Sequence, residues 1–176
     1  MMVDGRGNWQ AITPESMQAV PRFSEFETVG ANEAVHKACV DVLKDMEHRP
    51  LGTEEAISVR LSDLSTEKTE GEPGEGTVVP IDLNEPYLAV HNHPSNETFS
   101  FADIDAFGMR ANCVGIVAIG NNGANAFTLL KSGDYDLLGF ALFRAKVDKG
   151  YISFKSEDDF LKGLEAYGIH YQARRP

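Results

Sequence analysis

Residues 88–107, LAVHNHPSNETFSFADIDAF, constrain the fold most, because they predict a strand that turns directly into a helix. Residues 87–90 are apolar and typical of a strand, and Pro94 ends this pattern. Side chains alternate between the two faces of a strand, so His91 and His93 point in the same direction from its end. The sequence therefore predicts two imidazoles that are aimed into one small volume.

The second half of this stretch predicts a helix that begins after Ser100. Serine is favoured at a helix start, and residues 101–107 place apolar side chains at helical spacing. Asp103 then lies in the first turn, close to the end of the histidine strand. Imidazole nitrogen and carboxylate oxygen suit zinc, and three protein ligands leave a fourth position open for water in catalytic sites. The sequence therefore predicts a Zn2+ site formed by His91, His93 and Asp103.

The same residues also have a purely structural interpretation. Ser100 and Asp103 have the spacing of a helix-capping pair, in which the hydroxyl accepts a backbone N–H and the acid favours the positive end of the helix. Two histidines separated by one residue also occur on surfaces that bind no metal. The order of strand, paired histidines, proline, helix cap and acid makes metal binding the favoured interpretation.

Composition and charge limit the classes of function. We expect one domain, residues 31–176, preceded by an N-terminal arm, residues 1–30, and the 42% hydrophobic content is enough for a substantial core. The formal net charge of −11 repels phosphate backbones and argues against a nucleic-acid partner. No apolar run approaches the ~20 residues of a membrane span, and the start lacks the apolar segment of a signal peptide, so we expect a cytoplasmic protein without a membrane partner. Cys39 and Cys113 are expected to be small buried residues rather than a disulfide or a ligand pair.

Apolar periodicity predicts the remaining elements of a mixed or antiparallel sheet with helices against it. The predicted helices comprise residues 14–20, a helix from Asn32 to about residue 46, a helix capped by Ser132 and Asp134, and residues 156–167. The predicted strands comprise residues 55–61, 77–81, 114–119 and 126–130, and the acidic residues 64–76 are expected to form a solvated loop. The third helix is expected to face the core with Leu137, Leu138, Ala141, Leu142 and Ala145.

The motif formed by His91, His93, Pro94, Ser100 and Asp103 resembles the metal-binding motif of the JAMM (MPN-plus, JAB-domain) metalloisopeptidase superfamily. Its HNHPS run, followed by a serine and an ADI tripeptide, is similar to that of RadC-like and phage-associated members, although the loop before the serine is shorter in this chain. The resemblance covers roughly residues 34–146. It implies an α/β sandwich of the JAMM (cytidine-deaminase-like) type, with a mixed central sheet flanked by helices.

The resemblance also implies an activity. Members of this family are zinc metalloproteases, so the expected substrate is a protein or peptide with an amide or isopeptide bond, such as a bond to ubiquitin or a ubiquitin-like modifier. Zinc would lower the pKa of its bound water, and Ser100 would stabilise the oxyanion.

A glutamate upstream of the histidines is also implied, since in the resembling family it holds and deprotonates the attacking water. The run EEAISVRLSD is similar to the RadC-type stretch that carries this residue. Strand alternation places Glu55 on the same face as Ile57, and we expect the face with apolar neighbours to border the cleft. Glu55 is therefore the favoured base, with Glu54, or an ordinary exposed acid at a strand start, as the alternatives.

Two rival classes of function remain at this point. One is a non-catalytic metal-binding interaction module, a phage-associated or toxin-related JAMM-like scaffold, which the complete ligand set argues against. The other is a nuclease, suggested by the letters HNH, but that motif names three residues spread over a longer segment, and the acidic charge opposes DNA binding. If the acidic loop of residues 64–76 borders the substrate groove, it is expected to favour basic partners.

Overall fold

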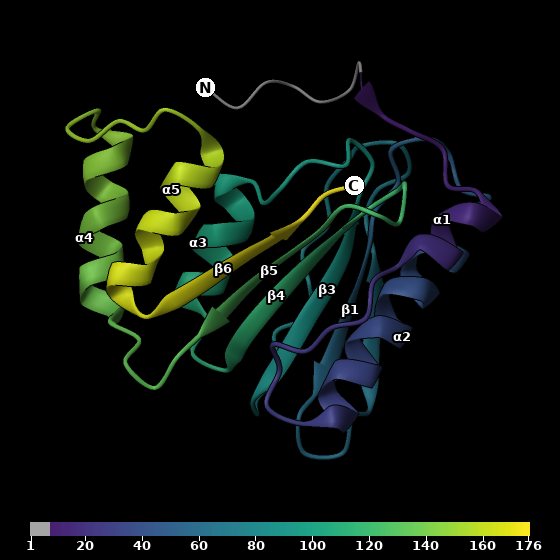
Figure 1. The fold of residues 1–176 in the computed structure, drawn as a ribbon, viewed down its shortest axis with the longest axis horizontal. Coiled ribbons are helices and arrows are strands. Elements are labelled where there is room, and N and C mark those ends of the chain that lie inside the picture. The colour runs from purple at the N-terminus through teal and green to yellow at the C-terminus, as the bar shows by residue number, and fades with distance from the viewer. Residues whose placement is uncertain (1–7) are drawn as a thin grey trace.

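One six-stranded mixed sheet carries the fold, and helices cover both of its faces (Figure 1). In a computed structural model, which describes residues 8–176, the strand order is β2-β1-β3-β4-β5-β6. Neighbouring strands are antiparallel except for β3 and β4, which are parallel. The predicted α/β class with a mixed sheet is confirmed. The strands are β1 (Glu55–Arg60), β2 (Thr66–Glu70), β3 (Tyr87–His93), β4 (Cys113–Gly120), β5 (Ala126–Lys131) and β6 (Ile169–Arg174).

The helices form two separate layers (Figure 1). Helix α2 lies on one face of the sheet with the short helix α1 packed beside it, and α3, α4 and α5 lie on the other face. Among the described residues, no helix is both long and apolar enough to cross a bilayer. The helices are α1 (Pro14–Ala19), α2 (Val29–Met46), α3 (Phe101–Met109), α4 (Leu137–Asp148) and α5 (Glu157–Gly163), and α5 continues into a 3-10 helix, Leu164–Tyr167.

Strand β3 is buried on both faces because each helical layer packs against one set of its alternating side chains. Leu88 and Val90 belong to the core under α2, whereas Tyr87 and Ala89 belong to the core under α3, α4 and α5. His91 continues the second set. The histidines therefore emerge on the α3 side of the sheet, at the carboxyl end of the strand.

Helix α2 has the predicted apolar stripe, although it begins three residues before Asn32. Thr28 is its N-cap, and the Thr28 hydroxyl accepts the backbone N–H of Ala31 at 3.0 Å. Every residue predicted to form the stripe is buried. Cys39 is one of them, and both it and Cys113 are free and buried, as predicted. The stripe consists of Val35, Ala38, Cys39, Val42, Leu43 and Met46.

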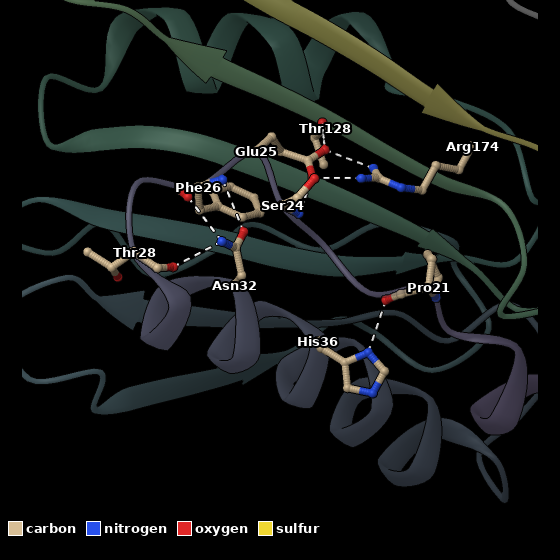
Figure 2. A network of polar contacts seen from close by, with 9 residues as sticks. All are labelled: Pro21, Ser24, Glu25, Phe26, Thr28, Asn32, His36, Thr128 and Arg174. Carbon is tan, nitrogen blue, oxygen red and sulfur yellow. Dashed lines mark hydrogen bonds and ion pairs between the residues drawn. The ribbon is translucent and has the colours of Figure 1, made fainter.

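The N-terminal segment, residues 8–28, packs into the core under α2 and is held there by polar contacts (Figure 2). Its apolar side chains Val20 and Phe26 are buried. Glu25 pairs with Arg174 of β6 through two hydrogen bonds of 2.6 Å and 2.8 Å, and Thr128 of β5 donates to the same carboxylate at 2.9 Å. We call these three residues the terminal clasp. Residues 1–7 of the predicted arm lie outside the described residues.

The clasp also sets the ionisation of Glu25. Burial alone would raise the pKa of Glu25, but the hydrogen bonds from Arg174 and Thr128 outweigh burial and hold this pKa below its usual value. A second anchor lies along α2, where Asn32 donates to the Phe26 carbonyl and accepts its N–H, each at 3.0 Å (Figure 2). The N-terminal segment is therefore fixed to both α2 and the far strands of the sheet.

Helix α4 differs from the prediction in both its start and its buried face. Asp136 is the N-cap, rather than Ser132 or Asp134, and the buried aromatic residues are Phe140 and Phe143. The Phe143 ring stacks on Phe160 of α5 with ring centroids 5.6 Å apart. Aromatic rings bury more surface than leucine side chains, so they determine which face turns inward. The residues predicted to face the core are exposed or half-buried instead: Leu137, Leu138, Ala141, Leu142 and Ala145.

The sequence also did not predict the two edge strands of the sheet, β2 and β6. Strand β2 lies within residues 64–76, which were predicted to be a loop, and residues 77–81 form no strand. The sequence of β2, TEKTE, carries no apolar period, and its pairing with β1 rests on backbone hydrogen bonds. Strand β6 was not predicted at all, and His170 within it is exposed.

Candidate metal centre

The end of β3 and the start of α3 bring the three predicted metal ligands together. The Nε2 atoms of His91 and His93 lie 2.7 Å apart. Oδ2 of Asp103 lies 3.3 Å from the first and 3.2 Å from the second of these nitrogens. All three side chains are largely buried. The strand-to-helix turn predicted from the sequence therefore makes one compact group of donors.

This group fits zinc. Neighbouring donors in a tetrahedral site with metal–ligand distances of about 2.0 Å lie about 3.3 Å apart. Both distances from Asp103 Oδ2 agree with that spacing, while the histidine nitrogens are somewhat closer to each other. Two imidazoles with one carboxylate are also a donor set that zinc accepts.

A second set of three donors overlaps the first. Glu54, His91 and His93 each offer a ligand atom, and these atoms lie within 4.8 Å of one another. The set that contains Asp103 is tighter, because its atoms lie within 3.3 Å of one another. The geometry therefore places Asp103 in the inner group and Glu54 at a distance that a water molecule can bridge.

Hydrogen bonds around the donors orient two of them. Nδ1 of His93 lies 2.8 Å from the carbonyl oxygen of Glu97, which directs Nε2 toward the centre. The backbone N–H of Ser100 donates to Asp103 Oδ2 at 3.0 Å, and the Ser100 hydroxyl accepts the N–H of Asp103 at 3.1 Å. The predicted capping pair is thus present and fixes the carboxylate. Nδ1 of His91 is buried and has no hydrogen-bond partner among the described residues.

The short loop between Pro94 and Ser100 is held by an asparagine network. Asn96 adopts a positive φ of 61°, which asparagine tolerates better than most residues. The side chain of Asn96 accepts the backbone N–H of Asn122 at 2.9 Å. The side chain of Asn125 donates to the backbone carbonyl of Asn96 at 3.0 Å. The turn between β4 and β5 therefore fixes the loop that places Ser100 at the start of α3.

Asn92, between the two histidines, positions the site and was missed by sequence reasoning. It lies on the opposite face of β3 and is fully buried. Its side chain accepts the backbone N–H of Glu55 at 2.9 Å and donates to the Thr53 carbonyl and to Asn121 at 3.1 Å and 3.0 Å. The sequence did contain a signal for this role, since Asn92 is a polar residue in an otherwise apolar strand and a buried amide needs hydrogen-bond partners.

The structure places Glu54, rather than the favoured Glu55, beside the histidines, which corrects the predicted side of β1. Ala56 pairs with His91 in the antiparallel ladder, so the two share a face, and Glu54 lies two residues before Ala56 on that same face. The apolar face that includes Ile57 packs under α2 instead. An apolar neighbour therefore indicated the helix-covered side of the strand and not the cleft.

Glu55 lies near Asp45 of α2 and Lys68 of β2, whose side chains form an ion pair at 2.8 Å. Burial, together with a hydrogen bond and charge repulsion from Asp45, raises the pKa of Glu55 to about 8. Oε1 of Glu55 is buried without a hydrogen-bond partner among the described residues. This acid is thus part of the α2 interface and is remote from the histidine side of the sheet.

The electrostatics of the centre favour positive charge. Burial would lower the pKa of His93, but Asp103, Glu54 and the Glu97 carbonyl outweigh burial and raise this pKa to about 9. Burial would raise the pKa of Asp103, but His91 and His93 hold it well below its usual value. Burial raises the pKa of Glu54, and the histidines only partly offset this effect. The carboxylates around two imidazoles therefore attract a cation.

A cavity of about 470 Å³ opens onto this centre. Glu54, His93, Ser100 and Asp103 are among the residues that line it, whereas His91 lines a smaller adjoining cavity of about 80 Å³ together with Asp103. Glu54 is only 5% exposed, and its carboxylate makes no hydrogen bond with another described residue. The arrangement provides a buried carboxylate, a hydroxyl and a metal-ligand group around one space.

Comparison with known protein families, curated proteins and solved structures finds no match to this chain. The geometry of the centre is therefore the basis for a functional proposal. Its main elements are a compact group of three donors, a nearby carboxylate and a cavity that reaches both.

Proposed function

We propose that the protein is a zinc-dependent hydrolase that cleaves an amide or isopeptide bond in a peptide or protein, with a site and fold of the JAMM type. The observation that supports this most is the convergence of His91, His93 and Asp103, two of which line a cavity that Glu54 also lines, with Glu54 close enough for a water molecule to bridge. A cytoplasmic setting and a ubiquitin-like modifier as the leaving or acyl group are part of the same proposal.

His91, His93 and Asp103 would hold the metal. Zinc, when bound, would supply a Lewis acid that lowers the pKa of a bound water and polarises the scissile carbonyl. Glu54 stays outside this ligand set because its carboxylate lies farther from the imidazole nitrogens than Asp103 does. Because the N–H of Ser100 already orients the Asp103 carboxylate, this side chain needs little rearrangement to bind a metal.

Glu54 would act as the general base. Its carboxylate has no other hydrogen-bond partner among the described residues, so it can accept a proton from the attacking water and then pass it to the leaving amine. A base of this kind contributes typically 100- to 10,000-fold to the rate. The surrounding burial excludes bulk water from this proton transfer.

Ser100 would contribute a hydrogen bond to the oxyanion. Its hydroxyl oxygen accepts the N–H of Asp103, and the hydroxyl hydrogen has no acceptor among the described residues. Because Ser100 also lines the cavity, that hydrogen can donate to a carbonyl oxygen of the substrate. The capping role and the catalytic role are compatible.

Metal content and activity test the proposal together. The purified protein is expected to hold about one zinc per chain by elemental analysis. The substitution His91→Ala removes one of three ligands and should abolish stoichiometric zinc, whereas His48→Ala, which changes an exposed histidine beyond α2, should leave it unchanged. Circular dichroism establishes whether each variant keeps its fold.

Hydrolysis of a panel of peptide and modifier-amide substrates should stop on chelation and return with added zinc. Zinc retained by the folded His91→Ala variant would refute the ligand assignment. Zinc binding without cleavage of any substrate in the panel would instead favour the non-catalytic interaction module.

A further inference from the structure

Three separate segments place carboxylates at the mouth of the cavity. Glu75 lies in the segment between β2 and β3, Glu97 in the loop after the histidines, and Glu157 at the first position of α5, and all three are exposed. Among the described residues that line the cavity, none is a lysine or an arginine. Among the described residues, Glu97 and Glu157 therefore give the mouth a local excess of negative charge.

The carboxylates at the mouth are close enough to affect one another. Burial raises the pKa of Glu157, and repulsion from Glu97 and from Asp158 raises it further. Arg175 offsets part of this effect, and its guanidinium also donates two hydrogen bonds to Asp158, at 2.9 Å and 3.0 Å. Arg175 is thus already engaged with another acid.

An aromatic ring lines the same cavity as these carboxylates. Trp9 lines the cavity and rests directly on backbone at Gly52 and Gly76, where an added Cβ would lie 2.1 Å and 2.6 Å from the ring, respectively. Its placement is reinforced by the N–H of Gln10, which donates to the Pro94 carbonyl at 2.8 Å. An indole face beside carboxylates is suited to the alkyl stem and the charged head of lysine or arginine.

The inner end of the same cavity also points to a ligand. Glu54 is only 5% exposed and lines the cavity. Its carboxylate has no hydrogen-bond partner among the described residues. We infer that the cavity binds a cationic peptide segment, with lysine or arginine side chains at the mouth beside Trp9, Glu97 and Glu157 and its scissile amide at Glu54. This inference rests on the proposed amide hydrolysis and adds the chemical class of the substrate.

Trp9 allows binding to be measured without turnover, because it is the single tryptophan of the chain. The full-length Glu54→Gln protein is titrated with blocked octapeptides of glycine and alanine that carry two lysines, two norleucines or two glutamates, and the fluorescence of Trp9 is followed. An exposed charge pair changes affinity by roughly 1.5- to 5-fold, so two pairs should favour the lysine peptide over the norleucine peptide by roughly 5-fold or more. The glutamate peptide should bind most weakly, and 0.5 M salt should reduce the preference.

Variants at the mouth assign the preference to specific residues. Adding Glu97→Gln and Glu157→Gln should weaken binding of the lysine peptide roughly 5-fold and leave binding of the norleucine peptide unchanged. Adding Glu27→Gln and Glu33→Gln removes the same charge from exposed positions at and just before α2 and should change neither. Circular dichroism and thermal melting verify that both double variants fold.

The outcomes separate this inference from the proposed hydrolysis. Equal affinity for the lysine and norleucine peptides, unchanged affinity in the mouth variant, or no binding of any peptide overturns the inference. A protein that cleaves its substrates without a charge preference retains the hydrolase proposal and loses the cationic substrate. A protein that binds the lysine peptide selectively and cleaves nothing retains the cationic ligand and loses the hydrolase proposal.

Discussion

Replacing Glu54 with glutamine should separate zinc binding from catalysis. Glutamine has nearly the shape of glutamate, so Glu54→Gln preserves the packing of a side chain that is 5% exposed. It removes the proton acceptor that lies within 4.8 Å of the histidine donors, while His91, His93 and Asp103 remain. The expected loss in kcat is 100- to 10,000-fold, which corresponds to about 3–5 kcal/mol of activation free energy.

The neighbouring substitution Glu55→Gln is the matched control. It makes the same chemical change one residue away, on the face of β1 that is turned toward Asp45 and α2. We expect zinc content and kcat/KM at pH 7 to stay within about twofold of the unsubstituted protein, since free-energy differences below about 0.4 kcal/mol correspond to such a factor.

The assay combines elemental analysis with initial rates on the best substrate of the panel, with each variant at the same zinc occupancy. The reasoning is refuted if Glu54→Gln retains full turnover, because an acid that close to the histidines would then have no role in proton transfer. Loss of zinc in Glu54→Gln would instead make Glu54 a ligand and refute the inner set that contains Asp103. Inactivation by Glu55→Gln alone would contradict the strand faces seen in the sheet.

Two further predictions concern a helix cap and a buried acid. Ser100→Ala should lower the free energy of unfolding by about 1 kcal/mol because the helix cap is lost, and it should reduce turnover by ~100-fold because the oxyanion donor is lost. If the midpoint of chemical denaturation falls while turnover stays intact, Ser100 acts only as a cap. Because the folded-state pKa of Glu55 is raised to about 8 from an ordinary 4.5, the folded protein binds more protons than the unfolded chain between these values, and its stability should fall as pH rises from about 5 to 8. Glu55→Gln should flatten this slope in urea titrations, so that its stability relative to the parent rises between pH 5 and pH 9, and an unchanged slope would contradict the assignment.

The donor group could be predicted from the sequence because its signals are local. His91 and His93 are related by the strand period, and Asp103 is placed by a helix cap only three residues before it. Asn92 was missed because its partners lie on two other segments, and only the tertiary structure brings them together.

The choice between Glu54 and Glu55 needed knowledge that a single strand does not contain. When a sheet is covered on one face only, the apolar side of a strand identifies the core. Here β1 is buried on each side, because α2 covers the face with Ile57 and the segment before β3 covers the face with Ser58, whose hydroxyl donates to the Ile81 carbonyl. Alternation therefore separates the two faces of β1 but does not identify the face that borders the cavity. The pairing of Ala56 with His91 decides the matter, and that register is a long-range property.

The sequence also failed where packing overrides periodicity. In α4 both the leucine stripe and the aromatic stripe have helical spacing, and the aromatic residues of α5 and of the segment before it selected Phe143. Strand β2 has no apolar pattern to detect, because an edge strand can be held by backbone pairing alone. Each error therefore reflects a partner element that the local pattern does not reveal.

The terminal clasp has a consequence for the order in which the protein completes its fold during synthesis. Glu25 and Arg174 are 149 residues apart in the chain, so a growing chain exposes the acid long before its partner exists. Until β6 has been made and paired with β5, burying Glu25 would leave a charge without a counter-ion, which is unfavourable. The N-terminal segment that Glu25 anchors also carries Trp9 to the cavity, next to Gln10, whose N–H donates to the Pro94 carbonyl. Nascent chains that lack the last strand should therefore hold the histidines in place before the outer wall of the cavity closes over them.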